Sequence, residues 1–190
     1  MNARFELNMD KPTFFRWVQD QHERYDWVDG KAVMQQGSTK HHNRVAAEFL
    51  FQLKSQLNRD DWLVFGTDFA VDLGEQVRYP DVMMLKLGGD GHDMSTDEPA
   101  VLVEVLSPSS VATDFTIKPP RYMALPSLEA YIVASQDEPR CWIWQRDTAK
   151  PGRPFPAEPS VVHGASEKID IAALGVSIAL ADIYRGMFKS

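Results

Sequence analysis

The sequence predicts an α+β domain with a mixed β-sheet flanked by helices. Short segments rich in Val, Leu and Phe follow one another in pairs, as the strands of hairpins do. One long segment has apolar residues at helical spacing, and the elements follow in the order α-ββ-α-ββ-β-α-ββ. We expect a single domain over residues 1–190, with a helix at 12–22 as an N-terminal appendage.

The first part of the chain predicts a helix, a hairpin and a second, longer helix. Apolar residues recur within 12–22 at spacings that fit a short helix. Asp29-Gly30 separates two alternating segments, which predicts a hairpin with strands at 24–28 and 31–35. Residues 38–58 carry an apolar face at helical spacing and form the strongest helix in the sequence.

The middle of the chain predicts strands around one polar loop. Residues 61–74 and 75–87 are expected to form an antiparallel pair, and 88–99 a glycine-rich loop. A buried strand follows at 100–107, and then a helix at 108–126 with a weak point at Pro119-Pro120. The remaining elements are strands at 129–135 and 140–146, a proline-rich loop at 149–159, and a last strand or two with a terminal helical turn.

The composition is that of a soluble globular protein, with 44% hydrophobic and 25% charged residues. No apolar run is long enough to span a membrane. The formal net charge of −7 argues against a protein that simply coats nucleic acid, but it is compatible with a nuclease whose site contains carboxylates. Cys141 is the single cysteine, so no intramolecular disulfide can form and a reducing, cytoplasmic location is expected.

A carboxylate in an apolar strand is the most informative feature of the sequence. Glu104 lies within "VLVEVLS", where burial is costly unless the charge is paired or bound to a metal. Asp81 opens the preceding core strand, and Lys118 lies 14 positions after Glu104, on or beside the next helix. Two carboxylates suit Mg²⁺, which polarises a phosphate and lowers the pKa of a bound water. A nearby lysine would orient or help deprotonate that water and neutralise charge.

Several motifs together resemble one known family. They are "YPDVMML", "VLVEVLSPSS", "LEAYIVAS", and Asp114, Lys118 and Tyr122 with three residues between each. This combination resembles the Uma family of putative restriction endonucleases, which belongs to the PD-(D/E)XK nuclease superfamily. "YDWVDGKAVM" and "HHNRVAAEFLFQL" are similar to the opening hairpin and first core helix of that family, so the resemblance runs from about Arg24 to Tyr184.

The resemblance implies a restriction-endonuclease-like core of αβββαβ type. It implies a divalent metal held by Asp81 and Glu104, together with a backbone carbonyl next to Glu104. The usual lysine two residues after the glutamate is Leu106 here, so the resemblance assigns the lysine's role to Lys118. The family usually has a glutamate where this chain has Asp26.

Each candidate residue also has an ordinary structural interpretation. Asp81 would be a turn aspartate after proline, and Glu104 a solvent-facing carboxylate at a sheet edge. Lys118 would be a surface lysine paired with Asp114. If Thr116 caps the helix, Lys118 stands at its start and Asp114 lies in the preceding loop.

Other residues are given supporting or structural roles. His41 and His42 lack partners at metal-ligand spacing, so a packed or hydrogen-bonded histidine is favoured, with a supporting role for His42 near the cleft left open. Tyr122 is expected in the core, and one of Trp142 and Trp144 is expected to face outward. The loop 88–99 and the segments near His42 are expected to border the cleft.

The predicted function is Mg²⁺-dependent hydrolysis of DNA phosphodiester bonds, with Mn²⁺ as a second candidate metal. Asp81, Glu104 and Lys118 are the predicted catalytic residues, with Asp81 and Glu104 as metal ligands. A homodimer is expected, because cutting both strands of a duplex needs two sites. A nuclease-fold binding or assembly module with weak or absent catalysis is the main alternative. A phosphodiesterase for RNA or a small nucleotide is the third.

Overall fold

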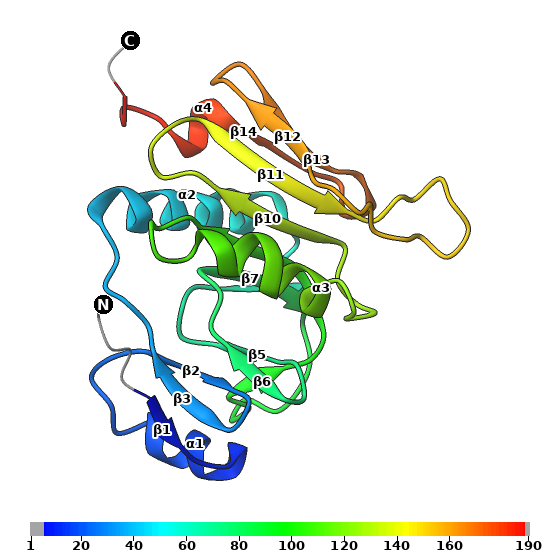
Figure 1. The fold of residues 1–190 in the computed structure, drawn as a ribbon. Helices are drawn as coiled ribbons and strands as arrows, with labels where there is room; N and C mark the ends of the chain where they lie inside the picture. Colours follow the sequence, from blue (N-terminus) through cyan, green and yellow to red (C-terminus); the bar gives the residue numbers. More distant parts are fainter. Residues whose placement is uncertain (1–5, 189–190) are drawn as a thin grey trace.

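The computed structural model describes residues 6–188 and confirms the predicted α+β class (Figure 1). It contains two six-stranded sheets and a separate two-stranded hairpin. The larger sheet carries most of the core, and the smaller sheet lies beside it toward the N-terminal end of the chain.

The larger sheet is mixed, with strand order β12-β11-β10-β9-β7-β4. Only the β9–β10 pair is parallel; the other four pairs are antiparallel. The strands are β4 (Trp62–Phe65), β7 (Val82–Lys86), β9 (Pro99–Val105), β10 (Ala130–Ala134), β11 (Arg140–Gln145) and β12 (Ser160–His163). The parallel pair requires a crossover, and the segment between β9 and β10 supplies it with a helical turn on one face of the sheet.

Helices cover the two faces of the larger sheet, as Figure 1 shows for α2 (Lys40–Gln56) and α3 (Lys118–Tyr122). Side chains alternate along β9, so Val101, Val103 and Val105 pack in the same cluster as the buried face of α2. Leu102 points to the opposite face and packs with Tyr122 of α3. Glu104 has the same parity as Leu102, and this places its carboxylate on the α3 side.

The smaller sheet has strand order β1-β3-β2-β6-β5-β8. Its strands are β1 (Glu6–Asn8), β2 (Tyr25–Val28), β3 (Lys31–Met34), β5 (Ala70–Asp72), β6 (Gln76–Arg78) and β8 (Ser95–Thr96). The β2–β3 hairpin turns at Asp29-Gly30, both with positive φ, as predicted from sequence. Helix α1 (Lys11–Val18) buries Phe14 in the core of this sheet and ends four residues earlier than expected, where a polar run begins.

The predicted antiparallel pair over 61–74 and 75–87 exists, but it is divided between the two sheets. Strands β4 and β7 pair in the larger sheet, whereas β5 and β6 pair in the smaller one. The break falls at Gly66–Phe69 in the first arm and at Tyr79-Pro80-Asp81 in the second. Pro80 lacks the N–H needed to continue a sheet ladder. Asp81 therefore lies at the junction between the two sheets.

The segment before α3 forms a π-helical turn, η1 (Thr113–Ile117). Residues 119 and 120 are prolines and cannot donate hydrogen bonds, while the Lys118 N–H donates to the Thr113 carbonyl. The Asp114 carbonyl instead accepts a hydrogen bond from the Tyr131 hydroxyl at 3.0 Å. Lys118 begins α3, as expected. The proposed cap at Thr116 is wrong, because its hydroxyl contacts the Ala112 carbonyl, and Asp114 lies in a helical turn, not a loop.

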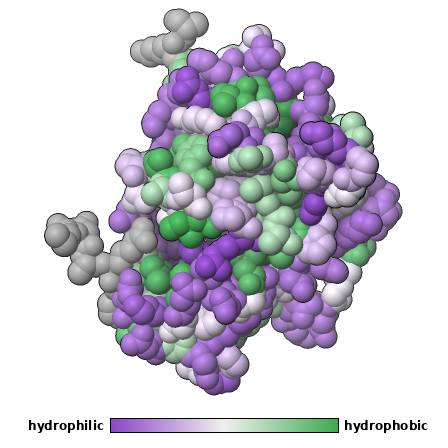
Figure 2. Space-filling model, turned by 45° about the vertical axis from the view of Figure 1, so that its right-hand side comes forward, coloured by the Kyte–Doolittle hydropathy of each residue, from purple (hydrophilic) through white to green (hydrophobic). Residues whose placement is uncertain are grey.

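The C-terminal part packs on α2. Here lie β13 (Lys168–Ile171), η2 (Ala172–Leu174), β14 (Val176–Ala179) and α4 (Leu180–Ile183). Ile169, Ile178 and Ile183 are buried in the same cluster as Val45 of α2. Within residues 6–188, no helix is both long and apolar enough to cross a bilayer. The face drawn in Figure 2 is mainly hydrophilic, with small hydrophobic areas interspersed.

Candidate active site

A cleft of about 290 Å³ lies between the two sheets. The smaller sheet contributes Asp26 and Arg78, and the larger sheet contributes Glu104 and Val105. The other lining side chains of interest here are Arg24, Ser38, Thr39, His42, Asp81, Ser107, Asp114 and Lys118. All three residues predicted to be catalytic therefore line one cleft.

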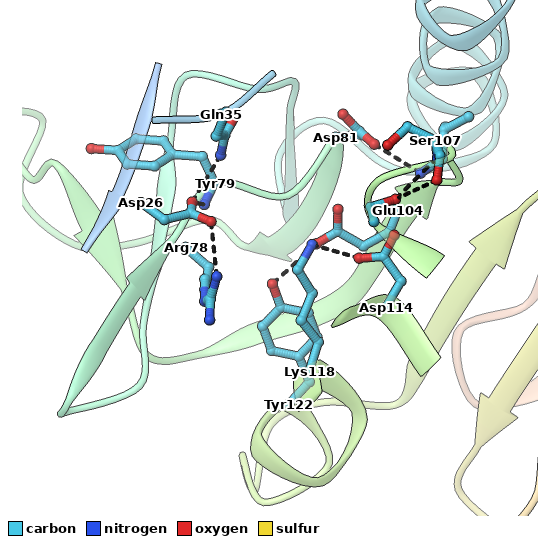
Figure 3. A network of polar contacts seen from close by, with 12 residues as sticks. Asp26, Gln35, Arg78, Tyr79, Asp81, Glu104, Ser107, Asp114, Lys118 and Tyr122 are labelled. Carbon is cyan, nitrogen blue, oxygen red and sulfur yellow. Dashed lines mark hydrogen bonds and ion pairs between the residues drawn. The ribbon is translucent and has the colours of Figure 1, made fainter. Parts of the chain in front are cut away.

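Glu104 is buried on a central strand, with only 5% of its surface exposed. Strand β9 is flanked by β7 and β10, so the solvent-facing edge interpretation of Glu104 is wrong. Its Oε1 is 2.7 Å from Lys118 Nζ and accepts a hydrogen bond from the Tyr122 hydroxyl at 3.1 Å. The three residues converge in Figure 3.

Lys118 is held between two carboxylates. Its Nζ lies 2.8 Å from Asp114 Oδ1, in addition to its contact with Glu104 (Figure 3). The i,i+4 pairing with Asp114 is present, but the lysine is not on the surface: its side chain is 11% exposed. Leu106, two residues after Glu104, packs against the apolar cluster that also contains Tyr122 of α3.

Asp81 is held at the junction of the sheets by two contacts. Its Oδ2 accepts a hydrogen bond from the Val105 N–H at 2.8 Å and lies 3.2 Å from Nε2 of His42. Asp81 follows Pro80 as a turn aspartate would, but these two contacts are to residues far along the chain, and its side chain lines the cleft. His42 is buried near the start of α2, whose N-cap is Thr39. It lines the cleft, at the location for which the sequence leaves a supporting role open.

Burial and crowding of charge shift the ionisation of this cluster. Removal from water raises the pKa of Glu104 to about 8, even though Lys118 opposes the shift, while Asp114 and Asp81 add to it. Burial alone would lower the pKa of Lys118, but the charges of Glu104, Tyr122 and Asp114 raise it well above its ordinary value. The pKa of the Tyr122 hydroxyl is also raised by burial and by the adjacent Glu104.

The opposite wall of the cleft carries a second buried ion pair. Asp26 Oδ2 lies 3.0 Å from a terminal nitrogen of Arg78, and Asp26 Oδ1 accepts hydrogen bonds from Gln35 and from the Tyr79 N–H (Figure 3). The Arg78 guanidinium also donates twice to Gln76. Asp26 stands in place of the family's usual glutamate. Both of its carboxylate oxygens contact residues of this wall.

The four carboxylates that line the cleft differ in what they can offer to a cation. Lys118 and Tyr122 both contact Oε1 of Glu104, and Val105 and His42 both contact Oδ2 of Asp81. The second oxygen of Glu104 and the second oxygen of Asp81 stay outside these contacts, whereas both oxygens of Asp26 are engaged by Gln35, Tyr79 and Arg78. No group of three or more His, Cys, Asp or Glu side chains in residues 6–188 is arranged to hold a metal ion. A hard cation that takes one or two carboxylates and water fits this donor set.

Two expectations about the surroundings are wrong. The loop 88–99 does not line this cleft but a different hollow, which Leu63, Phe65 and Phe69 also line. Trp142 and Trp144 both lie on the face covered by η1, where each ring contacts Phe115, so neither faces freely outward. Strand alternation gives residues two apart the same face, which explains the second error.

Sequence reasoning assigned Tyr122 only to the core. The side chain is fully buried as expected, but its hydroxyl also contacts Glu104. The spacing of Asp114, Lys118 and Tyr122 already placed these three on one helical face. The Asp26–Arg78 pair had no comparable signal, because it joins β2 to β6 across 52 positions.

The fold defines a class: an α+β protein of the nuclease-like, restriction-endonuclease type. The sequence profile of the Uma2 family, described as "Putative restriction endonuclease", matches residues 12–176. The chain belongs to this family. Restriction-endonuclease-like families generally use divalent metals.

Similar proteins extend over most of the chain. The uncharacterized protein slr1290 of Synechocystis sp. is 23% identical over 180 residues, which cover 92% of this chain and 90% of that protein. The uncharacterized protein sll1609 of the same organism is 25% identical over 119 residues. A crystal structure from Anabaena variabilis, described as a putative nuclease belonging to DUF820, has a TM-score of 0.72 and 12% identity, covering 90% of this chain and 94% of that one. This last similarity shows the shared fold.

Proposed function

We propose that this protein is a divalent-metal-dependent endonuclease that hydrolyses phosphodiester bonds of DNA. The carrying observation is that Lys118 reaches Glu104 at 2.7 Å within a cleft that Asp81 also lines. Strand β9 supplies the carboxylate of Glu104. The following helix supplies the lysine side chain that is missing at position 106, where this chain has leucine. Membership of a restriction-endonuclease family supports the same reaction class.

In this proposal Asp81 and Glu104 hold Mg²⁺, or Mn²⁺, through the oxygens outside their internal contacts. The bound cation supplies Lewis acidity toward the phosphate and lowers the pKa of a water molecule. Val105 and His42 hold Asp81 in orientation, while Lys118 and Tyr122 hold Glu104. Fixed ligands avoid the cost of reorganising the site during the reaction.

Lys118 acts here as a fixed positive charge. Two carboxylates within 2.8 Å favour its ammonium form, so it is poorly suited to remove a proton from water. An ammonium at this position stabilises the negative charge that develops on the phosphate in the transition state. Of the three roles open to this lysine, charge stabilisation and water orientation fit the geometry better than general-base catalysis.

The test is cleavage of supercoiled plasmid and of linear duplex DNA with Mg²⁺ or Mn²⁺, against an EDTA control. Asp81→Asn and Glu104→Gln should each lower the cleavage rate by roughly a hundredfold or more. Glu158→Gln, which changes an exposed carboxylate away from the cleft, should retain the wild-type rate. Cleavage that survives Glu104→Gln would overturn the site assignment.

The binding-module alternative has one observation in its favour: Lys118 pairs with both Glu104 and Asp114, so the cluster is neutralised in large part without a cation. Purified protein that binds DNA but never nicks it would support this alternative.

Parallel assays on single-stranded RNA and on cyclic nucleotides test the third candidate, a phosphodiesterase that acts on RNA or on a small nucleotide. The expected homodimer would sediment at twice the 21.5 kDa of one chain, and a monomer would contradict it.

A further inference from the structure

Four basic side chains line the cleft within residues 6–188, and three of them contact a carboxylate. Arg78 is paired with Asp26, His42 with Asp81, and Lys118 with both Glu104 and Asp114. Arg24 is the exception among the described residues: its guanidinium contacts the Ser38 hydroxyl at 3.3 Å and has no carboxylate within ion-pair distance.

Arg24 is held at a defined place on the cleft wall. It directly precedes strand β2, and its carbonyl accepts a hydrogen bond from the Gln35 N–H at 2.8 Å. Ser38, its side-chain partner, precedes Thr39, the N-cap of the 17-residue helix α2. The positive end of that helix dipole therefore lies at the same corner of the cleft as the Arg24 guanidinium.

A polyanion that enters this cleft meets four carboxylates, those of Asp26, Asp81, Glu104 and Asp114. A cation held by Asp81 and Glu104 would offset the repulsion at the reacting phosphate, but not along the rest of the strand. An arginine without an acidic partner has N–H groups directed to a neutral hydroxyl and can give them to a phosphate without breaking an ion pair. Arg24 is the cleft residue that meets this condition.

We propose that Arg24, with Ser38 beside it, binds a backbone phosphate that flanks the phosphate being cleaved. This inference rests on the proposed nuclease function and names its substrate class: a polynucleotide with at least two consecutive phosphodiesters. A cyclic nucleotide or another isolated phosphodiester has no second phosphate for Arg24 to bind. The contact accordingly favours a nuclease over the small-nucleotide phosphodiesterase.

The first experiment compares two substrates, duplex DNA and bis(p-nitrophenyl) phosphate, which contains one phosphodiester and no flanking phosphate. Arg24→Ala should lower kcat/KM for DNA by roughly tenfold and leave hydrolysis of the small diester unchanged. Arg24→Lys should recover part of the loss on DNA, since it keeps the charge but not the forked donors. An equal loss on both substrates, or no loss on DNA, would overturn the proposal.

Arg16→Ala is the matched control. Arg16 also contacts a hydroxyl, that of Thr13 at 3.1 Å, but it is exposed on α1 and does not line the cleft. Arg16→Ala and Arg24→Ala each remove one positive charge from the protein. The DNA activity of this variant should match that of the wild type, and thermal melts of each variant check that the fold is intact.

The second experiment measures binding without cleavage, in the Glu104→Gln background, by fluorescence anisotropy of a labelled duplex at several salt concentrations. Adding Arg24→Ala should weaken binding and reduce the slope of log K against log salt by about 0.9, the value for one phosphate contact. An unchanged slope would contradict the contact. If the wild type hydrolyses neither substrate, the proposed function fails, and this binding measurement still decides the role of Arg24.

Discussion

The ammonium of Lys118 lies 2.7 Å from Oε1 of Glu104, although 14 positions of chain separate the two residues. Glu104 is on the central strand β9, and Lys118 begins the helix that crosses over to β10. The parallel β9–β10 crossover returns the chain over the face on which Glu104 stands. Lys118 in this crossover can thus pair with Glu104, although the chain has leucine, not lysine, two residues after Glu104.

The Tyr122 hydroxyl gives the first prediction. Tyr122→Phe keeps the buried ring but removes the hydrogen bond to Glu104, which should cost about 1 kcal/mol of unfolding free energy. DNA cleavage should also slow, because Glu104 loses one of the two groups that orient it. Tyr184→Phe is the control: its hydroxyl is hydrogen-bonded to the Ser135 carbonyl outside the cleft, so it should lose similar stability but retain activity. Urea denaturation and initial cleavage rates measure the two effects, and equal cleavage by both variants would contradict an orienting role for Tyr122.

Removal of the Lys118 charge should destabilise the metal-free protein. At pH 9, above the Glu104 pKa of about 8, Lys118→Met leaves Glu104 and Asp114 buried together without their cation, at a cost of roughly 3 kcal/mol. Mg²⁺ should recover more stability in this variant than in the wild type, because the cation then offsets the uncompensated charge. Chemical denaturation in EDTA and in Mg²⁺ measures both quantities.

Lys54→Met is the control for that experiment. Lys54 is exposed on α2, so its substitution should change stability by no more than about 0.5 kcal/mol. A Lys118→Met protein as stable as the wild type in EDTA would show that the buried ion pairs contribute nothing net to the fold.

Cation binding should depend on pH through Glu104. Its pKa is raised from 4.5 to about 8, so between these values the folded, metal-free protein holds a proton that the unfolded chain lacks. By linkage, the contribution of this group to stability falls as pH rises from 4.5 to 8. A cation requires the ionised carboxylate, so Mg²⁺ affinity should rise with pH and level off above about 8.

Isothermal titration calorimetry at pH 7 tests this proton release. In two buffers with different heats of ionisation, the apparent enthalpies should differ by close to one released proton per cation. Glu104→Gln should abolish that difference together with most of the binding. A buffer-independent enthalpy in the wild type would rule out displacement of a proton from Glu104.

The thiol of Cys141 should be unreactive while the protein is folded. The residue is fully buried, and burial raises the pKa of its thiol to about 12, despite the nearby Tyr184 hydroxyl. At pH 8 the reaction with a disulfide reagent should be about a thousandfold slower than in the unfolded chain, because the thiolate is the reacting form. Absorbance kinetics with and without guanidinium chloride measure this ratio, and rapid labelling of the folded protein would contradict it.

Local patterns were sufficient for most of the elements. The Asp29-Gly30 hairpin, the long helix α2 and the buried strand β9 were all predicted because turn residues and apolar periodicity act over a few neighbouring positions. The division of residues 61–87 between two sheets was not predicted, because the residues on both sides of each break have the composition of strands. Which sheet a strand joins depends on partners far away in the chain. The assignment of residues 1–190 to one domain stays a prediction.

The sequence by itself determined the chemical inventory of the cleft: a carboxylate too costly to bury alone in an apolar strand, an aspartate after proline, and a lysine on the next helix. It also carried the motifs that resemble one family, and the chain belongs to that family. Only the tertiary structure decided that Lys118 contacts Glu104, that Asp26 pairs with Arg78, and that Arg24 is left without an acid among the described residues. These contacts join residues of different strands, helices and sheets, and the distance between two side chains across such elements follows from packing, which spacing along the chain does not encode.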